Sequence, residues 1–156
     1  MGIALALTAV LSFADSCISA AFPIPGIRLG LANIAIIAVM MRYGTVSGLL
    51  MTLLRSGFVF LTRGASAAVM SLSGGLLAFA AAVLMIIMKR SCKFSCIIAA
   101  MCHTLGQLAA ACVITGSVYT LAYAAVLMPV SIFTGFLTGT VLQALQGFLD
   151  DRKVVK

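Results

Sequence analysis

The sequence predicts an all-α membrane protein: a single domain, residues 1–156, of six transmembrane helices in which the second helix is short. Three observations support this. Hydrophobic residues make up 63% of the chain and charged residues 8%, and the mean hydropathy of +1.25 lies far above that of soluble domains. Apolar runs long enough to cross about 30 Å of hydrocarbon recur along the chain. Basic residues stand mostly between those runs.

The first two helices differ in length. The first is expected at residues 3–21 and ends before Pro23 and Pro25, which cannot continue a helix without losing hydrogen bonds. The second, at residues 29–41, covers only about 20 Å at 1.5 Å per residue. The segment before it, which contains Pro25 and Arg28, is therefore expected to dip into the protein at membrane depth.

Four further helices are expected at residues 45–61, 65–88, 94–114 and 129–149, with Pro129 in the first turn of the last one. The basic stretch KRSCK separates the fourth helix from the fifth. The segment TGSVYTLAY follows the fifth helix, and its tyrosines favour a place at the membrane interface.

The distribution of lysine and arginine predicts the orientation in the membrane. With the N-terminus inside, seven basic residues fall in inner loops and the tail: Arg42, Lys89, Arg90, Lys93, Arg152, Lys153 and Lys156. Only Arg28 and Arg63 fall in outer loops. We therefore expect a multi-pass protein of the cell (plasma) membrane with both termini in the cytoplasm. The basic residues form no stripe beside aromatic residues, so no nucleic-acid partner is expected.

Several polar residues fall within the apolar helices, where an ionisable group costs at least a few kcal/mol unless it faces protein or water. Asp15, Arg55 and His103 are therefore expected to face inward. Counting about 1.5 Å per residue from the helix ends places them between the midplane and the outer surface. The same layer receives Asn33, Ser71, Ser73 and Gln107.

This layer predicts an outward-facing pocket for a small molecule. Its expected contacts are Arg28, Asn33, Arg55, Ser71, Ser73, Gly74, His103 and Gln107. Arg28 and Arg55 would supply positive charge and the others hydrogen bonds, while Asp15 would be a structural counter-ion to one of the arginines. His103 and Gln107 lie four residues apart and share a helix face; each taken alone is also explained by hydrogen bonds between helices.

Enzyme chemistry by this chain alone is not expected. The three acidic residues include two in the C-terminal tail, so no acidic cluster can hold magnesium, and no glycine-rich phosphate loop with a lysine is found. Cys92 and Cys96 lie near no histidine or acid in sequence and are interpreted as small apolar residues. We expect neither a metal nor another cofactor.

Four motifs resemble a known family in order and spacing: PGIRLGLANI (25–34), LLR (53–55), SLSGGLLA (71–78) and HTLGQL (103–108). They are similar to the bacterial membrane proteins labelled heptaprenyl diphosphate synthase component I, also called the Gx transporter family. That family is similar in size and six-helix layout to the substrate-binding S components of energy-coupling factor (ECF) transporters. The resemblance implies an S-component-like bundle in the lipid bilayer.

By the same resemblance, the chain would be the substrate-binding subunit of a micronutrient uptake transporter. It would capture a small anionic or polar-headed solute and join a transmembrane coupling protein and two ATPase subunits. A second hypothesis is a membrane accessory subunit of polyprenyl diphosphate or quinone biosynthesis that binds an isoprenoid. A third is a membrane subunit that binds a flavin. The sequence does not identify the solute.

Overall fold

The computed structural model describes residues 2, 6, 8, 10–14 and 31–154, and it describes their side chains except for residues 31, 32 and 145–154. Apart from short turns, all of these residues are helical, and no strand occurs among them. The predicted all-α fold is therefore confirmed.

Except for the last helix, the long helices agree to within two residues with the ranges expected from the sequence. They are α2 (Leu31–Tyr43), α3 (Thr45–Arg63), α4 (Ala65–Ile87), α5 (Cys92–Thr115), the 3₁₀ helix η1 (Val118–Tyr123) and α6 (Ala124–Val154). Residues 2, 6, 8 and 10–14 are also helical. Among the described residues, four stretches are long and apolar enough to cross a membrane: Thr45–Arg63, Ala65–Ile87, Cys92–Thr115 and Val118–Ala144. The second helix has 13 residues, as predicted.

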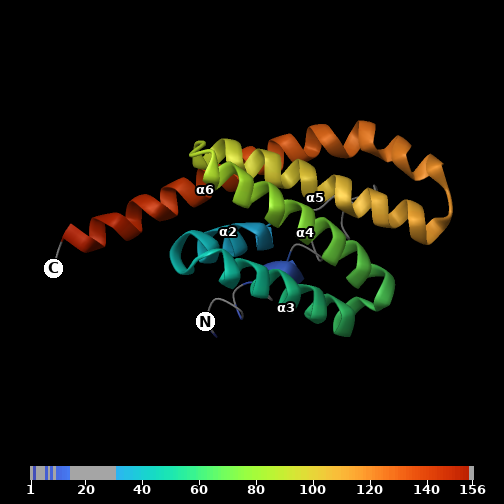
Figure 1. Cartoon of the computed structure of the whole chain (residues 1–156), viewed down its shortest axis with the longest axis horizontal. Helices are drawn as coiled ribbons and strands as arrows, with labels where there is room; N and C mark the ends of the chain where they lie inside the picture. The colour runs from blue at the N-terminus through green and yellow to red at the C-terminus, as the bar shows by residue number, and fades with distance from the viewer. Residues whose placement is uncertain (1, 3–5, 7, 9, 15–30, 155–156) are drawn as a thin grey trace.

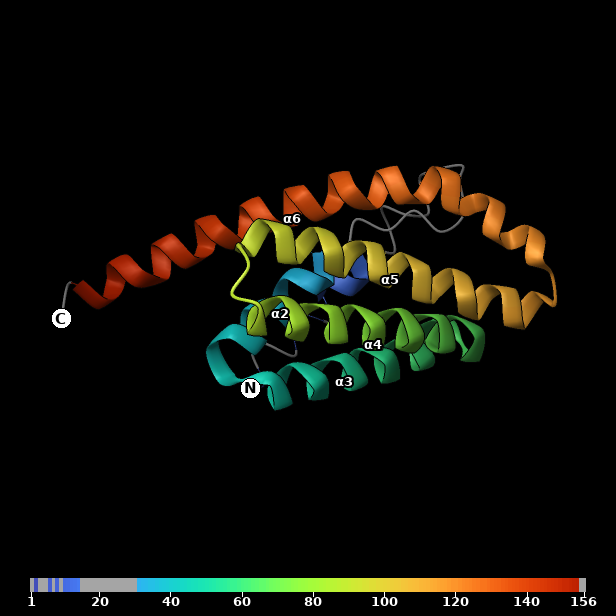
Figure 2. The same ribbon diagram turned by 45° about the horizontal axis from the view of Figure 1, so that its top comes forward.

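The long helices lie side by side in chain order, from α3 through α4 and α5 to α6 (Figure 1). The short α2 packs on α3 and also contacts α6. Figure 2 shows the C-terminal part of α6 extending well beyond the other helices. The bundle is thus a row of antiparallel neighbours with α2 placed across one side of it.

The turns between helices depend on residues with a positive φ angle. Three glycines follow the ends of α2, α3 and α5: Gly44 (φ 91°), Gly64 (φ 87°) and Gly116 (φ 63°). Residues with a Cβ atom rarely adopt such angles, whereas glycine adopts them without steric cost. At the end of α4 the left-handed residue is Lys89 (φ 52°). Its N–H bonds to the carbonyl of Ile86 and the next N–H bonds to the carbonyl of Met85, which is the Schellman pattern of a helix C-terminus.

The bundle has a small apolar core and an apolar outer surface. Leu142 is fully buried, and it lies in a cluster with Ile37, Met40, Ala78, Ala82, Cys96 and Ala99. Large apolar side chains on the outside are largely exposed, for example Val46 (80%), Leu61 (82%) and Val113 (83%). Such an exterior suits contact with lipid tails, which are as apolar as the side chains themselves.

Small residues bring α6 close to α5. A Cβ atom on Gly135 would lie 2.7 Å from the Cα of Ile97, and one on Gly139 would lie 2.9 Å from the Cα of Lys93. The Nζ atom of Lys93 stands 5.7 Å from the centre of the Phe136 ring on α6, a cation–π geometry. The two helix backbones therefore touch, and larger residues at these positions would separate them.

The predicted start of the last helix at Pro129 is wrong. The helix α6 begins five residues earlier, at Ala124, and Pro129 lies inside it. Alanine, leucine and methionine before the proline are strong helix formers, so they extend the helix upstream of it. The proline has no N–H for the carbonyl four residues earlier, that of Ala125, and α6 is visibly curved along its length (Figures 1 and 2).

Replacing Lys89 by glycine is expected to stabilise the protein by about 1 kcal/mol, because glycine adopts the left-handed conformation without steric cost. The measurement is the midpoint of thermal unfolding of the detergent-purified protein. Lys89→Ala is the matched control, since it removes the charge and keeps the Cβ atom. An equal gain for both variants would show that charge, not backbone strain, limits stability at this turn.

Candidate functional site

The candidate site begins with Arg55, a charged residue on the inward face of α3. The buried residues of this helix are Gly48, Met51, Thr52, Arg55, Ser56 and Val59, a spacing that gives one helix face. Arg55 is only 4% exposed. The expectation that it faces inward is therefore confirmed, and its guanidinium needs hydrogen bonds within the protein.

Two of those hydrogen bonds go to neutral oxygens from other helices. The Nε atom of Arg55 donates to Ser12 Oγ at 3.1 Å, and Nη1 donates to Asn33 Oδ1 at 2.7 Å. Because a guanidinium only donates, these contacts fix Asn33 with its oxygen toward Arg55. The amide nitrogen of Asn33 then presents its N–H groups elsewhere. Arg55 thus links α3 to α2 and to the N-terminal helical residues.

A second polar group lies on α5. His103 is 4% exposed and Gln107 is 8% exposed, and their Nε2 atoms are 3.1 Å apart. Because an amide nitrogen only donates, the imidazole Nε2 accepts, and a neutral ring then carries its proton on Nδ1. Gln107 keeps its amide oxygen as an acceptor. This pair therefore places an imidazole and an amide side by side inside the bundle.

Gly74 on α4 makes room for this pair. A Cβ atom at Gly74 would lie 2.7 Å from the carbonyl oxygen of His103, 2.8 Å from Gln107 Cγ and 3.0 Å from His103 Nδ1. The space that a side chain at position 74 would need is therefore filled by α5. We find Gly74 in the role of a close helix contact, next to two of the other predicted site residues.

Ser73 and Gly106 join α4 to α5 at the same point. The hydroxyl of Ser73 donates to the carbonyl of Gly106 at 2.9 Å. A Cβ atom at Gly106 would lie 2.7 Å from the carbonyl oxygen of Ser73 and 2.8 Å from the Cα of Gly74. The Ser73 hydroxyl is thus engaged between helices, and the two backbones are in direct contact.

Contacts between α3 and α4 relate Arg55 to the pair on α5. A Cβ atom on Gly75 would lie 2.7 Å from the Thr52 methyl group, so these two residues are at one level. Arg55 lies three residues further along α3, about 4.5 Å higher at 1.5 Å per residue. It therefore stands near the level of Ser71 on the antiparallel α4. The Arg55 group and the His103 group occupy adjacent levels on either side of α4, each with its own hydrogen bonds.

Ser71 has an unusual environment. It is 1% exposed, and its hydroxyl has no hydrogen-bond partner among the described residues. Thr52 and Ser56 on α3 instead donate to carbonyls of their own helix. A buried hydroxyl of this kind keeps its capacity to donate and to accept, which is uncommon in folded proteins.

Two predicted residues are not placed. Asp15 and Arg28 lie outside the described residues, so their expected roles stay predictions. Among the residues that are described, no group of three histidine, cysteine, aspartate or glutamate side chains could hold a metal ion. Beside Asn33 lies a narrow, mostly apolar cleft between α2, α3, α4 and α5, with an accessible volume of about 20 Å³, room for roughly one water molecule.

The sequence did not identify Ser12 as a partner of Arg55. Its hydroxyl accepts a hydrogen bond from the guanidinium. The available signal was its position: a hydroxyl one turn before Asp15 on an apolar helix stands at a depth where polar groups pair with one another.

One comparison with known proteins gives a match. The family model described as heptaprenyl diphosphate synthase component I matches residues 4–145. No curated protein and no solved structure matches the chain.

Gly106→Ala is expected to destabilise the protein by roughly 1–3 kcal/mol, because the new methyl group would overlap the backbone of α4. The control is Gly57→Ala, where an added Cβ meets no atom within 4 Å. Thermal unfolding in detergent compares the two variants. Equal midpoints for Gly106→Ala and the unmodified protein would contradict direct backbone contact between α4 and α5.

Proposed function

The chain belongs to the heptaprenyl diphosphate synthase component I family, and on that premise we propose that it is a substrate-binding membrane subunit of a small-molecule uptake system. It would bind rather than convert its ligand, a small anionic or polar-headed solute. The proposed ligand contacts are Arg28, Asn33, Arg55, Ser71, His103 and Gln107. In this proposal Ser73 and Gly74 shape the site by holding α4 against α5.

The observation that carries the proposal is the burial of Arg55. A guanidinium that is 4% exposed inside an apolar bundle is costly, and such residues within membrane segments are typically functional. Its hydrogen bonds to the oxygens of Ser12 and Asn33 hold the group in place at the junction of three helical segments. A ligand anion would add a charge-assisted hydrogen bond, which is stronger than a neutral one.

The neighbouring groups support an anion with a polar body. Asn33 turns its amide N–H groups away from Arg55, and Ser71 carries a buried hydroxyl with no described partner. Both add donors near the cation. Gln107 adds an acceptor at the adjacent level. The set favours a solute with a negative group and a neutral polar group.

The position of basic residues supports an outward-facing site. Arg42 ends α2, while Lys89, Arg90 and Lys93 surround the α4–α5 turn, so these four are at the same end of the antiparallel bundle. Arg63 is at the other end, at the α3–α4 turn. If the more basic end is cytoplasmic, Arg55 lies near the middle of the membrane, one residue to the exterior side of the centre of α3, which is the depth that an outward-facing pocket would have to reach. In the same proposal both termini are cytoplasmic and the membrane is the plasma membrane.

The proposed partners are a transmembrane coupling protein and ATPase subunits, by similarity of layout to ECF S components. A second function, a membrane accessory subunit of polyprenyl diphosphate or quinone biosynthesis, is supported by the family description. Co-purification with a soluble prenyl synthase would favour that function. Co-purification with ATPase subunits would favour uptake.

Removing the charge of Arg55 is expected to abolish retention of the ligand. Native mass spectrometry of the detergent-purified protein compares the unmodified chain with Arg55→Met and with Arg42→Met, a control at the exposed end of α2. Loss of one charge-assisted hydrogen bond corresponds to a roughly 10- to 100-fold weaker affinity. We expect a bound small molecule in the unmodified chain and in Arg42→Met, and a strongly reduced signal in Arg55→Met.

His103→Leu provides a second test at the adjacent level and is expected to weaken retention as well. Thermal unfolding of each variant separates loss of ligand from loss of fold. Retention of the same molecule by folded Arg55→Met and His103→Leu proteins would refute the proposed site.

A further inference from the structure

The turn between α4 and α5 concentrates positive charge at one end of the bundle. Lys89, Arg90 and Lys93 fall within five consecutive residues, and the first two are exposed. None of the side chains that the structure describes is acidic, so no described carboxylate neutralises these three cations. Like charges this close repel one another, and an anion bound among them would relieve that repulsion.

The backbone of Lys89 indicates that a cation is kept in this turn at a cost to stability. Its φ angle of 52° lies in the left-handed region, which is unfavourable for a residue with a Cβ atom. The ends of α2, α3 and α5 are followed by glycines at such angles, whereas the end of α4 is followed by this lysine. Strain of this kind is concentrated at functional positions, so the charge of Lys89 has a use on this surface.

Lys93 is held in place between α5 and α6. Its Nζ atom stands 5.7 Å from the centre of the Phe136 ring, which favours one direction for the side chain. Its Cα atom lies 2.9 Å from the position that a Cβ on Gly139 would take, so its backbone is fixed by the helix contact. A cation that is ordered in advance loses less entropy when it binds an anion.

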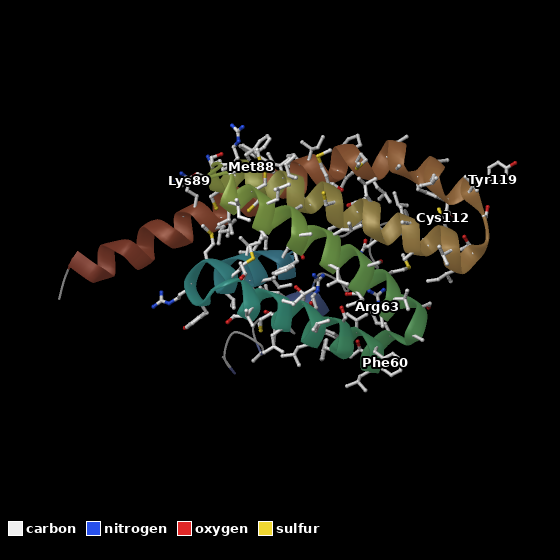
Figure 3. All side chains as sticks on the ribbon, in the orientation of Figure 1. Phe60, Arg63, Met88, Lys89, Cys112 and Tyr119 are labelled. Atoms are coloured by element: carbon white, nitrogen blue, oxygen red, sulfur yellow. The ribbon has the colours of Figure 1, made fainter. Side chains whose placement is uncertain are left out.

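Exposed apolar side chains flank the three cations. Ile87, Met88 and Phe94 are 71%, 49% and 46% exposed, and Figure 3 shows Met88 next to Lys89 at this end of the bundle. At the end of a membrane helix, basic groups reach the lipid head groups while apolar side chains contact the acyl chains. An anionic phospholipid matches both features of the turn, whereas a soluble acidic protein would match only the charge.

We propose that the α4–α5 turn binds an anionic phospholipid, with the head group at Lys89, Arg90 and Lys93 and an acyl chain along the apolar side chains that flank them. Clusters of basic residues beside a membrane helix attract anionic head groups in this way. The lipid holds this end of the bundle at the level of the head groups. The inference goes beyond the proposed function and uses none of the residues of the candidate site.

A fluorescence experiment tests the turn directly. The chain has no tryptophan, so Phe94→Trp places a single indole at the turn. Tyr119→Trp is the matched control, because Tyr119 is an aromatic residue that is 89% exposed at the opposite end of the bundle (Figure 3). Each variant is reconstituted in vesicles that mix phosphatidylglycerol with phosphatidylcholine, and one of the two lipids carries bromine on its acyl chains to quench tryptophan. Both leaflets have the same composition, so the orientation of the protein does not affect the comparison.

We expect phosphatidylglycerol to bind at Phe94→Trp roughly fivefold more tightly than phosphatidylcholine, the effect of about one basic residue near an anionic surface. The two lipids should quench Tyr119→Trp equally. Raising the salt concentration from about 0.1 M to about 1 M should weaken the preference, because the Debye length falls from about 10 Å to about 3 Å. Replacing Lys89, Arg90 and Lys93 together by glutamine should remove it.

Equal quenching of Phe94→Trp by the two brominated lipids would overturn the inference. An equal preference for phosphatidylglycerol at both tryptophans would also overturn it, because the lipid would then have no particular place on the protein. So would a preference that persists both in high salt and in the glutamine variant. The salt titration needs no substitution in the turn, so the test holds even if the glutamine variant does not fold. If the turn shows no lipid preference but the folded glutamine variant loses a co-purifying protein, the turn binds a protein partner and the lipid inference fails.

Discussion

Close helix packing at glycine residues is the constraint on which this bundle depends. Lipid tails give apolar helix surfaces no reason to associate, so neighbouring helices are held by packing and by hydrogen bonds. Each adjacent pair has a glycine at a close contact. Gly48 lies against the Met40 side chain between α3 and α2, and Gly75 lies against the Thr52 methyl group between α4 and α3. Gly106 lies against the backbone of Gly74 between α5 and α4, and Gly135 lies against the backbone of Ile97 between α6 and α5. These contacts fix the level of every helix relative to its neighbour.

The levels set by glycine determine which polar groups meet. Contact of Gly74 with α5 places His103 and Gln107 against α4. Contact of Gly75 with Thr52 sets α3 so that Arg55 stands three residues, about 4.5 Å, beyond the level of that contact. A one-turn slip of α3 would move Arg55 by about 5.4 Å and separate it from Asn33, whose oxygen is 2.7 Å away. The site is therefore a consequence of helix packing rather than of any loop among the described residues.

This explains which parts of the molecule could be predicted. Helix ranges follow from local signals, since apolar runs end at residues such as Gly44 and Gly64 that adopt positive φ angles. Inward placement of Arg55 and His103 follows from the cost of exposing them to lipid. The contact of Gly74 with Gln107 is different, because it depends on how two helices approach. The start of α6 was missed because a proline is compatible with both a first turn and a bent interior.

The short α2 connects these observations. It runs antiparallel to α3. Asn33 on α2 contacts Arg55, and Met40 on α2 contacts Gly48, so the described contacts between the two helices lie between these two pairs. The Arg55 guanidinium therefore stands at the N-terminal end of α2, where the described packing of that helix stops. The hydrogen bond between Asn33 and Arg55 and the contact between Met40 and Gly48 therefore fix α2 against α3 at both ends of that stretch.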